Sequence, residues 1–577
     1  MRYLRKPAIV AVLAAGAFGV AQQATAESQP TRNYVVVYEQ GQSATAAHQA
    51  IAAAGGKLVK ENGKIGVATV ASKDPAFIRH ATAQRALLGA AKDRPIGHTP
   101  SDGLTRWQKV ERAGLDTKGK PGKVPAPAPS ADPLAGLQWD MRMIDATTEG
   151  SYAKQQGSKA VRVGIIDTGV DASHPDIAPN FDFALSRNFT TDKPDIDGPC
   201  EEADCKDPAT VDQGGHGTHV AGTVGAALNG IGIAGVAPKV DIVNLRGGQD
   251  SGYFFLQPSL DALTYAGDNG IDVVNMSYYI DPWLYNCAAN PADSPAEQAE
   301  QRTIIAATQR ALSYARDRGV TLVAAEGNGH TDMGNPKVDD TSPDYPVDEN
   351  GDPANARHRD IDNSCINMPT EGKGVIGVTS VGPSQRKAYY SDYGLEQADV
   401  SAPGGDAHDP GAPTAQIPSE VLSTYPEALG REEGTIKPDG TPATPAVIRS
   451  TANGQTAYYE YLQGTSMASP HAVGVVALIV AEYGKRDKRH GGVTLAPDKV
   501  ERILKKSATD HACPTPRLQR YDLDGDGDVD NSDPRASWKE PQYDATCEGS
   551  ADRNGFYGEG IIDALAAVSP GGKAHKR

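Results

Sequence analysis

Two hydrophobic patterns divide the chain. In its first part, short β-branched runs alternate with helical periodicity. We expect strands at Tyr34–Glu39 and Lys64–Val70, and helices at Ala44–Ala54 and Asp74–Leu88. Together they form a small α+β unit of about 65 residues, a size that is only marginally stable alone.

From residue 161 onward, short apolar runs alternate with amphipathic segments. The apolar runs predict strands at Val161–Ile166, Val240–Leu245, Ile271–Met276, Val320–Ala325 and Val375–Val381. Between two of them, one helical face carries Ile304, Ile305, Thr308, Ala311, Leu312 and Ala315. This alternation predicts an α/β fold: a parallel sheet with helices on both faces, which binds ligands at the carboxyl ends of its strands.

The ends of these units follow from composition. The first residues have a basic start, an apolar stretch and the small residues Ala24 and Ala26, which predicts a secretory signal peptide over residues 1–26 and an extracellular protein. The alternative, a membrane anchor, needs about 20 uninterrupted apolar residues. We expect no membrane association after signal removal, because no later segment looks long enough to span a bilayer. The predicted units are then residues 27–97, a linker over 98–131, and a large domain over 132–577. The linker prediction rests on a stretch rich in Pro, Gly and Lys from Lys118 to Pro133.

Charge and cysteine content narrow the class of protein. A net charge of −17 with scattered acidic residues argues against a nucleic-acid partner, which would need a clustered basic face. All six cysteines lie from Cys200 onward, and export would allow them to form disulfides. Six cysteines permit 15 pairings. Proximity alone favours Cys200 with Cys205 and Cys513 with Cys547.

Three segments carry the residues of an acyl-transfer enzyme. Asp167 follows a predicted strand in VGIIDTGVDASHPD, His216 lies between glycines in GGHGTHVAGT, and Ser466 lies where a loop enters an apolar helix in LQGTSMASPH. A serine hydroxyl becomes a strong nucleophile when a histidine takes its proton, and a carboxylate orients that histidine. We expect these three side chains to meet in a catalytic triad.

Taken in order, DTGVD, HGTHVAGT and GTSMASPH make the chain resemble the subtilisin-like serine peptidase family, from about Asp132 to Val568. The resemblance implies an endopeptidase that cleaves polypeptide substrates through an acyl-enzyme. It also implies that the amide of Asn328 and the backbone N–H of Ser466 stabilise the oxyanion. A catalytically silent relative that binds peptides is the alternative, and an esterase would need a GxSxG motif where this chain has GTSMA.

The resemblance also points to substrate-binding residues. They are Ser277, Tyr278, Tyr279, Ala325, Glu326 and Gly327. Tyr278 and Tyr279 stand where the family usually has small residues, and Glu326 stands where it prefers alanine, so the substrate preference is expected to differ. Two acidic insertions, DKPDIDGPCEEADCKD and DYPVDENGD, read as solvated loops. At a cleft rim they would favour basic substrates.

The N-terminal unit, residues 27–97, resembles the inhibitory propeptide of this family. The resemblance implies that the unit inhibits the enzyme within the same chain, with its tail near Arg94–Gly97 running through the active site. We expect self-cleavage after export, somewhere between Ile96 and Ser130, because the exposed linker begins there.

A repeating acidic segment between Cys513 and Cys547 predicts structural calcium. In YDLDGDGDVDNSDPR the carboxylates have the spacing of a calcium loop, with Gly527 at the turn. The expected ligands are Asp522, Asp524, Asp526, Asp528 and Asp533. The alternative is a solvated turn without an ion. A second, weaker site is expected where Asp176 and Asn229 match calcium ligands of the family.

Overall fold

The computed structural model describes residues 30–93, 110–112, 131–344, 357–409, 415–521, 523 and 543–571. The N-terminal unit is an antiparallel sheet with strand order β2-β3-β1-β4. Its elements are β1 (Arg32–Tyr38), α1 (Ala44–Ala53), β2 (Lys57–Asn62), β3 (Val67–Ser72), α2 (Phe77–Thr82) and β4 (Leu87–Lys92). The prediction of one helix over Asp74–Leu88 was wrong at its end, because Leu87–Lys92 pairs with β1 as the edge strand β4. Strand β2 was not predicted, because its Lys and Glu residues leave little apolar pattern.

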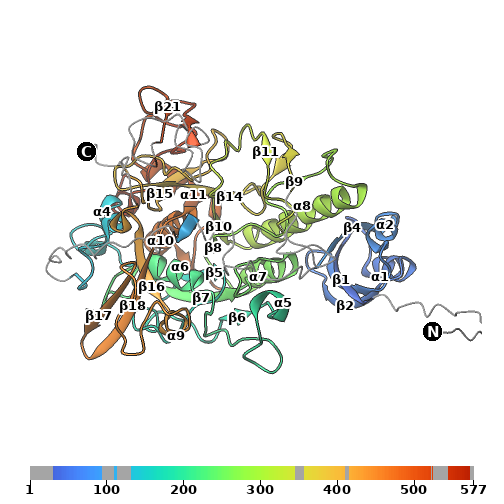
Figure 1. Cartoon of the computed structure of the whole chain (residues 1–577), viewed down its shortest axis with the longest axis horizontal. Coiled ribbons are helices and arrows are strands. Elements are labelled where there is room, and N and C mark those ends of the chain that lie inside the picture. Colours follow the sequence, from blue (N-terminus) through green and yellow to red (C-terminus); the bar gives the residue numbers. More distant parts are fainter. Residues whose placement is uncertain are drawn as a thin grey trace, which may run out of the picture.

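The N-terminal unit lies against one side of the large domain, beside α7 (Leu256–Asp268) and α8 (Pro295–Arg316) (Figure 1). One face of its sheet packs on its own helices α1 and α2. The other face packs on the large domain, where Val35, Val37 and Val67 join a cluster that includes Ile304 and Ala307 of α8. The sheet is therefore covered on one side by a helix that belongs to another unit.

The large domain is built on a seven-stranded sheet with the order β15-β14-β10-β8-β5-β7-β6. All neighbouring strands in it run parallel. Its strands are β5 (Arg162–Ile166), β6 (Arg187–Asn188), β7 (Asp241–Arg246), β8 (Val273–Met276), β10 (Thr321–Ala325), β14 (Val375–Val381) and β15 (Val400–Pro403). The five strands predicted from the sequence are all present, within two residues at each end.

Helices cover both faces of this sheet, as predicted. Successive residues of one strand point to opposite faces: Val273 packs with α6 (His216–Gly225) and α10 (Thr465–Tyr483), whereas Val274 packs with α7 and α8. Helix α8 begins at a capping box, in which Ser294 and Glu297 each bond the other's backbone N–H. Its predicted apolar residues Ile304, Thr308, Ala311, Leu312 and Ala315 are buried.

Helix α10 is the central helix of the large domain. It is long and apolar enough to cross a membrane by length and composition, so the expectation that no later segment reaches that length was wrong. Most of the helix is buried against the sheet and α6, as Figure 1 shows at the centre of the molecule. Its apolar character therefore belongs to the core.

Smaller elements complete the large domain. A second antiparallel sheet, with the order β16-β18-β17, consists of β16 (Val421–Tyr425), β17 (Val447–Ala452) and β18 (Gln455–Leu462). The further helices are α4 (Trp139–Met143), α5 (Pro194–Asp197), α9 (Glu427–Glu432), α11 (Pro497–Ser507) and α12 (Ala564–Ala567). Short paired strands are β9 (Asn286–Cys287) with β13 (Cys365–Ile366), β11 (Val338–Asp339) with β12 (Arg359–Asp360), β19 (Lys485–Arg486) with β20 (Val493–Thr494), and β21 (Leu518–Gln519) with β22 (Ala545–Thr546).

Three disulfides join the cysteines. Cys200–Cys205 and Cys513–Cys547 are the two pairs favoured by proximity in the sequence, and Cys287–Cys365 is the third. The third bridge links β9 to β13 across 78 residues of sequence. All three bridges lie in the large domain, and none lies in the N-terminal unit.

Candidate active site

The histidine and the aspartate meet at the carboxyl edge of the parallel sheet. Asp167 follows β5 directly and is fully buried, and its Oδ1 lies 2.7 Å from Nδ1 of His216. His216 is the first residue of α6, after Gly215, whose φ of 78° is in the left-handed region that favours glycine. Asp212 fixes this turn, because its carboxylate accepts hydrogen bonds from the N–H groups of Gly215 and Thr218.

The serine and the asparagine meet at the start of α10. Ser466 is the second residue of that helix, where backbone N–H groups have no partner within the helix. Asn328 follows β10, and its Oδ1 accepts hydrogen bonds from the N–H and the hydroxyl of Thr465, both at 2.9 Å. These bonds turn the Asn328 amide nitrogen toward the space in front of Ser466. Two donors therefore converge on the place where an oxyanion would form.

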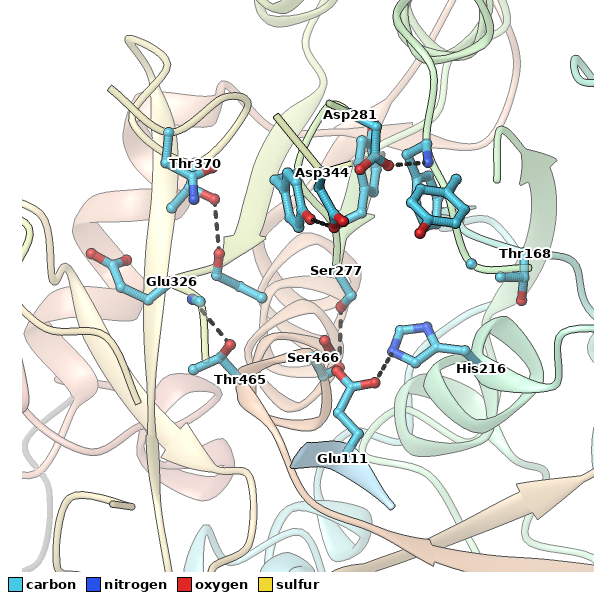
Figure 2. A pocket seen from close by; sticks show the side chains of 18 residues that line it. Glu111, Thr168, His216, Ser277, Asp281, Glu326, Asp344, Thr370, Thr465 and Ser466 are labelled. Carbon is cyan, nitrogen blue, oxygen red and sulfur yellow. Dashed lines mark hydrogen bonds and ion pairs between the residues drawn. The ribbon is translucent and has the colours of Figure 1, made fainter. Parts of the chain in front are cut away.

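A segment of the predicted linker lies inside this site. Residues 110–112 lie beside Gln463, the residue that follows β18, and Gln463 holds them by donating hydrogen bonds to the carbonyl oxygens of Val110 and Glu111, both at 3.0 Å. The buried Glu111 carboxylate lies 3.6 Å from Nε2 of His216, and it accepts a hydrogen bond of 3.3 Å from Asn328. Figure 2 shows Glu111 in front of Ser466, between the nucleophile and the base. The carboxylate therefore occupies the groups that would act on a substrate.

Glu111 also changes the protonation of the histidine. Burial lowers the pKa of His216, but the charges of Asp167 and Glu111 outweigh that effect and raise the pKa well above its ordinary value. A protonated histidine cannot accept the serine proton. Among the described residues, no hydrogen bond joins the Ser466 hydroxyl to His216. With Glu111 in place, the carboxylate therefore lies where a substrate would have to reach His216 and Asn328.

A pocket extends from Ser466 between the segments that follow β8 and β10. The residues that line it include Thr168, His216, Tyr253, Phe254, Ser277, Tyr278, Tyr279, Asp281, Ala325, Glu326, Gly327, Asp344, Asn367, Thr370 and Ser466. The hydroxyl of Ser277 donates to the carbonyl oxygen of Ser466 at 3.1 Å, which ties the pocket wall to the nucleophile. All six substrate-binding residues expected from the sequence therefore line one pocket beside the predicted triad.

The three pocket residues that depart from the family pattern are held by different contacts. Tyr278 stacks on Phe254, with ring centroids 4.2 Å apart, and Tyr279 donates a hydrogen bond of 2.6 Å to Asp344. Glu326 is fully buried, and in Figure 2 its carboxyl points away from Ser466. It faces Gly377, where a Cβ atom would come within 2.3 Å of Oε2. Burial, with nearby acidic residues, raises the pKa of Glu326 well above its ordinary value.

Two groups of described residues bear on metal binding. Asp176 and Asn229 lie close together beside Asp132, and Oδ1 of Asp176 is buried without a hydrogen-bond partner. A second group brings carboxylate oxygens of Asp192, Glu201, Asp207 and Asp250 within 4.8 Å of one another. Arg246 already contacts three of those four carboxylates, so it supplies a countercharge there. The predicted ligands Asp522, Asp524, Asp526, Asp528 and Asp533 lie outside the described residues.

Sequence reasoning missed three residues at the site. Glu111 gave no signal, because it lies in a stretch without apolar periodicity, and the expected tail at Arg94–Gly97 lies outside the described residues. Asp281 belongs to no motif. Asp344 begins the acidic insertion DYPVDENGD, which was expected to be a solvated loop. Its place inside the pocket depends on a contact that the sequence does not show: its N–H donates to the carbonyl oxygen of Pro282 at 2.7 Å.

Comparisons with known proteins agree with this geometry. The profile of the subtilase family matches residues 158–532. Subtilisin DY from Bacillus licheniformis is 28% identical over 61% of this chain and 86% of its own length. Thermitase from Thermoactinomyces vulgaris is 26% identical over 64% of this chain and 90% of its own length.

Solved structures show the same fold. The epidermin leader peptide processing serine protease from Staphylococcus aureus is similar with a TM-score of 0.56 and 19% identity, covering 93% of this chain and 98% of that one. Fervidolysin from Fervidobacterium pennivorans, a keratinolytic enzyme related to subtilisin, has a TM-score of 0.53 and 20% identity, covering 94% of this chain and 61% of that one. With the profile match over most of its length, the chain belongs to the subtilase family and is a serine endopeptidase.

Proposed function

We propose that Ser466 attacks the scissile carbonyl, that His216 takes its proton, and that Asp167 holds the imidazole in the required tautomer. The observation that carries this proposal is the 2.7 Å contact between Asp167 Oδ1 and His216 Nδ1, because it leaves Nε2 facing the mouth of the pocket. His216 then gives this proton to the leaving amine as the C–N bond breaks, which leaves the acyl-enzyme on Ser466. Water hydrolyses the acyl-enzyme, with His216 as base again.

Asn328 and the N–H of Ser466 stabilise the oxyanion in this scheme. The two bonds from Thr465 fix the Asn328 amide before the substrate arrives, so its nitrogen needs no rearrangement as charge develops. The helix N-terminus adds a favourable field at the same place.

The test is covalent labelling of the processed enzyme with an organophosphonate, together with cleavage of casein. The expected result is one label per chain on Ser466 and casein cleavage that Ser466→Ala abolishes. The matched control is Ser313→Ala, an exposed serine of α8. Labelling or cleavage that survives in Ser466→Ala would contradict the assignment, and a silent peptide-binding relative would show neither in the parent.

The same chain is made as an inhibited precursor under this proposal. The position of Glu111 between His216 and Asn328 supports it, as does the docking of the N-terminal unit on α8. Self-cleavage in the linker then releases residues 27–97, and separation of Glu111 from the site restores a neutral histidine. The signal peptide over residues 1–26 and the three disulfides support secretion to the extracellular space.

We also propose that the folded chain binds calcium as a structural ion at two sites. Asp176 Oδ1, buried and without a hydrogen-bond partner among the described residues, fits a hard cation, and Asp132 and Asn229 supply further oxygens nearby. The acidic loop with Asp522, Asp524, Asp526, Asp528 and Asp533 is the other proposed site. Bound calcium would stabilise the folded state by mass action.

Melting curves with calcium and with a chelator separate the two sites. We expect calcium to raise the melting temperature of the parent, and expect a smaller rise both in Asp176→Asn and in the double variant Asp522→Ala, Asp526→Ala. An unchanged calcium shift in either variant would remove that site from the proposal.

A further inference from the structure

The pocket beside Ser466 ends in two carboxylates. Asp281 follows Ser277 by four residues, so it lies at most about 14 Å from the residue that contacts the nucleophile. Asp344 comes from a separate loop that is joined to the first by the bond from its N–H to Pro282. In Figure 2 the two carboxylates lie side by side beyond Ser277, on the side away from Glu111.

Each carboxylate is held in place by a hydrogen bond. The N–H of Phe254 donates to Asp281 Oδ2 at 2.6 Å, and the hydroxyl of Tyr279 donates to Asp344 Oδ2 at 2.6 Å. An ionised carboxylate has about four acceptor positions on two oxygens, so each group can accept hydrogen bonds from more than one donor. The two groups are therefore oriented acceptors within the pocket.

Their surroundings favour a positively charged ligand. Asp281 is 7% exposed, and burial followed by the charge of Asp344 raises its pKa well above the ordinary value. A cation between the two groups would relieve both effects. Tyr253, Phe254 and the tyrosines after Ser277 form apolar walls along the way to the carboxylates. Such walls suit the aliphatic stem of a lysine or arginine and the flat face of a guanidinium.

We infer that this pocket binds the substrate side chain on the acyl side of the scissile bond and selects arginine or lysine there, with Asp281 and Asp344 as the specificity-determining residues. The inference rests on the proposed function, because it places the cleaved bond at Ser466. A large apolar side chain would fit the walls but would place apolar atoms against two carboxylates, which is unfavourable. A guanidinium instead matches the geometry of carboxylates with paired hydrogen bonds.

The experiment compares peptide substrates that differ only at that residue: arginine, lysine, citrulline and leucine. Citrulline has the shape of arginine without its charge. We expect kcat/KM for arginine to exceed that for citrulline and for leucine by at least about 10²-fold, because a site built for a polar partner rejects analogues that leave its groups unpaired. In Asp344→Asn and in Asp281→Asn the ratio of arginine to citrulline should fall toward one. The matched control Asp439→Asn, an exposed acid on another loop, should keep the parent ratio.

The outcomes separate this inference from the proposed function. An enzyme that takes the phosphonate label and cleaves casein, yet cleaves citrulline or leucine peptides as fast as arginine peptides, overturns the inference alone. An enzyme that takes no label and cleaves nothing overturns both. Since Asp281 also bonds the backbone of Phe254, Asp281→Asn is paired with a melting curve, and the parent substrate comparison decides the question if that variant does not fold.

Discussion

The sheet of the N-terminal unit and the sheet of the large domain differ in what covers them. The large sheet is covered on both faces by helices of its own domain, and three disulfides secure the loops around it. The small sheet is covered by its own helices on one face only, and its other face packs on α8 of the large domain. Separation would expose Val35, Val37 and Val67 of the small unit to water. A unit built this way is stable when docked and marginal once released, which suits a temporary inhibitor.

The rim of the interface between the small sheet and the helices α7 and α8 is polar. Lys60 contacts Asp261 of α7 at 2.7 Å, and Arg310 of α8 donates to the carbonyl oxygen of Tyr38 at 2.8 Å. Exposed pairs of this kind contribute at most about 1 kcal/mol each and weaken with salt. Docking therefore depends mainly on the apolar face, and the rim fixes its orientation.

The prediction with the largest expected effect tests whether the enzyme itself cuts the linker between the N-terminal unit and the large domain. Ser466→Ala removes the nucleophile, and in a family member such a loss lowers turnover by about 10⁶-fold. We expect the secreted variant to remain a full-length precursor, measured by mass spectrometry of protein made in a protease-deficient host. A variant that still matures there would show that another activity cuts the linker.

The next prediction concerns Asn328, the residue that donates a hydrogen bond to Glu111 of the linker. Asn328→Ala removes one oxyanion donor, and the corresponding loss in a related enzyme lowers kcat by about 10² to 10³-fold. Steady-state kinetics of the processed enzyme should show this decrease mainly in kcat, because the interaction is made in the transition state. If KM alone changed, Asn328 would act in substrate binding instead. Thr331→Ala, further along the same loop, is a suitable control.

A smaller effect should appear in the pH dependence of self-cleavage. Part of the raised pKa of His216 comes from Glu111, so Glu111→Gln lowers that pKa. Neutral histidine is the active form, and its fraction rises as pH rises through the pKa. The variant precursor should therefore process faster than the parent at the acid end, by roughly tenfold for each unit by which the pKa falls. Identical pH profiles for both precursors would exclude this role for Glu111.

The smallest effect should come from the polar rim. Inhibition of the processed enzyme by an added N-terminal unit should weaken only a few-fold in Lys60→Ala, and less so at high salt. Val37→Ala, which truncates the apolar face, should weaken inhibition more and without such salt dependence. Inhibition constants measured at two salt concentrations distinguish the two. A larger loss of inhibition in Lys60→Ala than in Val37→Ala would show that the polar rim contributes more to docking than the apolar face.

Much of the active site was predictable because its residues lie in long local motifs at the ends of strongly patterned strands. The strands around Asp167, Asn328 and Ser277 are continuous apolar runs, so their positions follow from the sequence, and the carboxyl ends of parallel strands converge. The edge strand β4 was taken for part of a helix because LLGAAK has little β-branched character, and its pairing with β1 decides its conformation. Tertiary contacts commonly override such weak local preferences.

The sequence by itself determined the family and the parallel sheet and singled out the candidate residues of acyl transfer, because each is encoded in contiguous segments with a local physical signature. Only the tertiary structure decided where Glu111, Asp281 and Asp344 lie. Each is an acidic residue outside any recognised motif, and acidic residues are usually solvated. Their burial at the site depends on backbone contacts from Gln463, Phe254 and Pro282, which are distant in sequence or carry no pattern. Long-range contacts of this kind are set by packing and leave no periodicity in the chain.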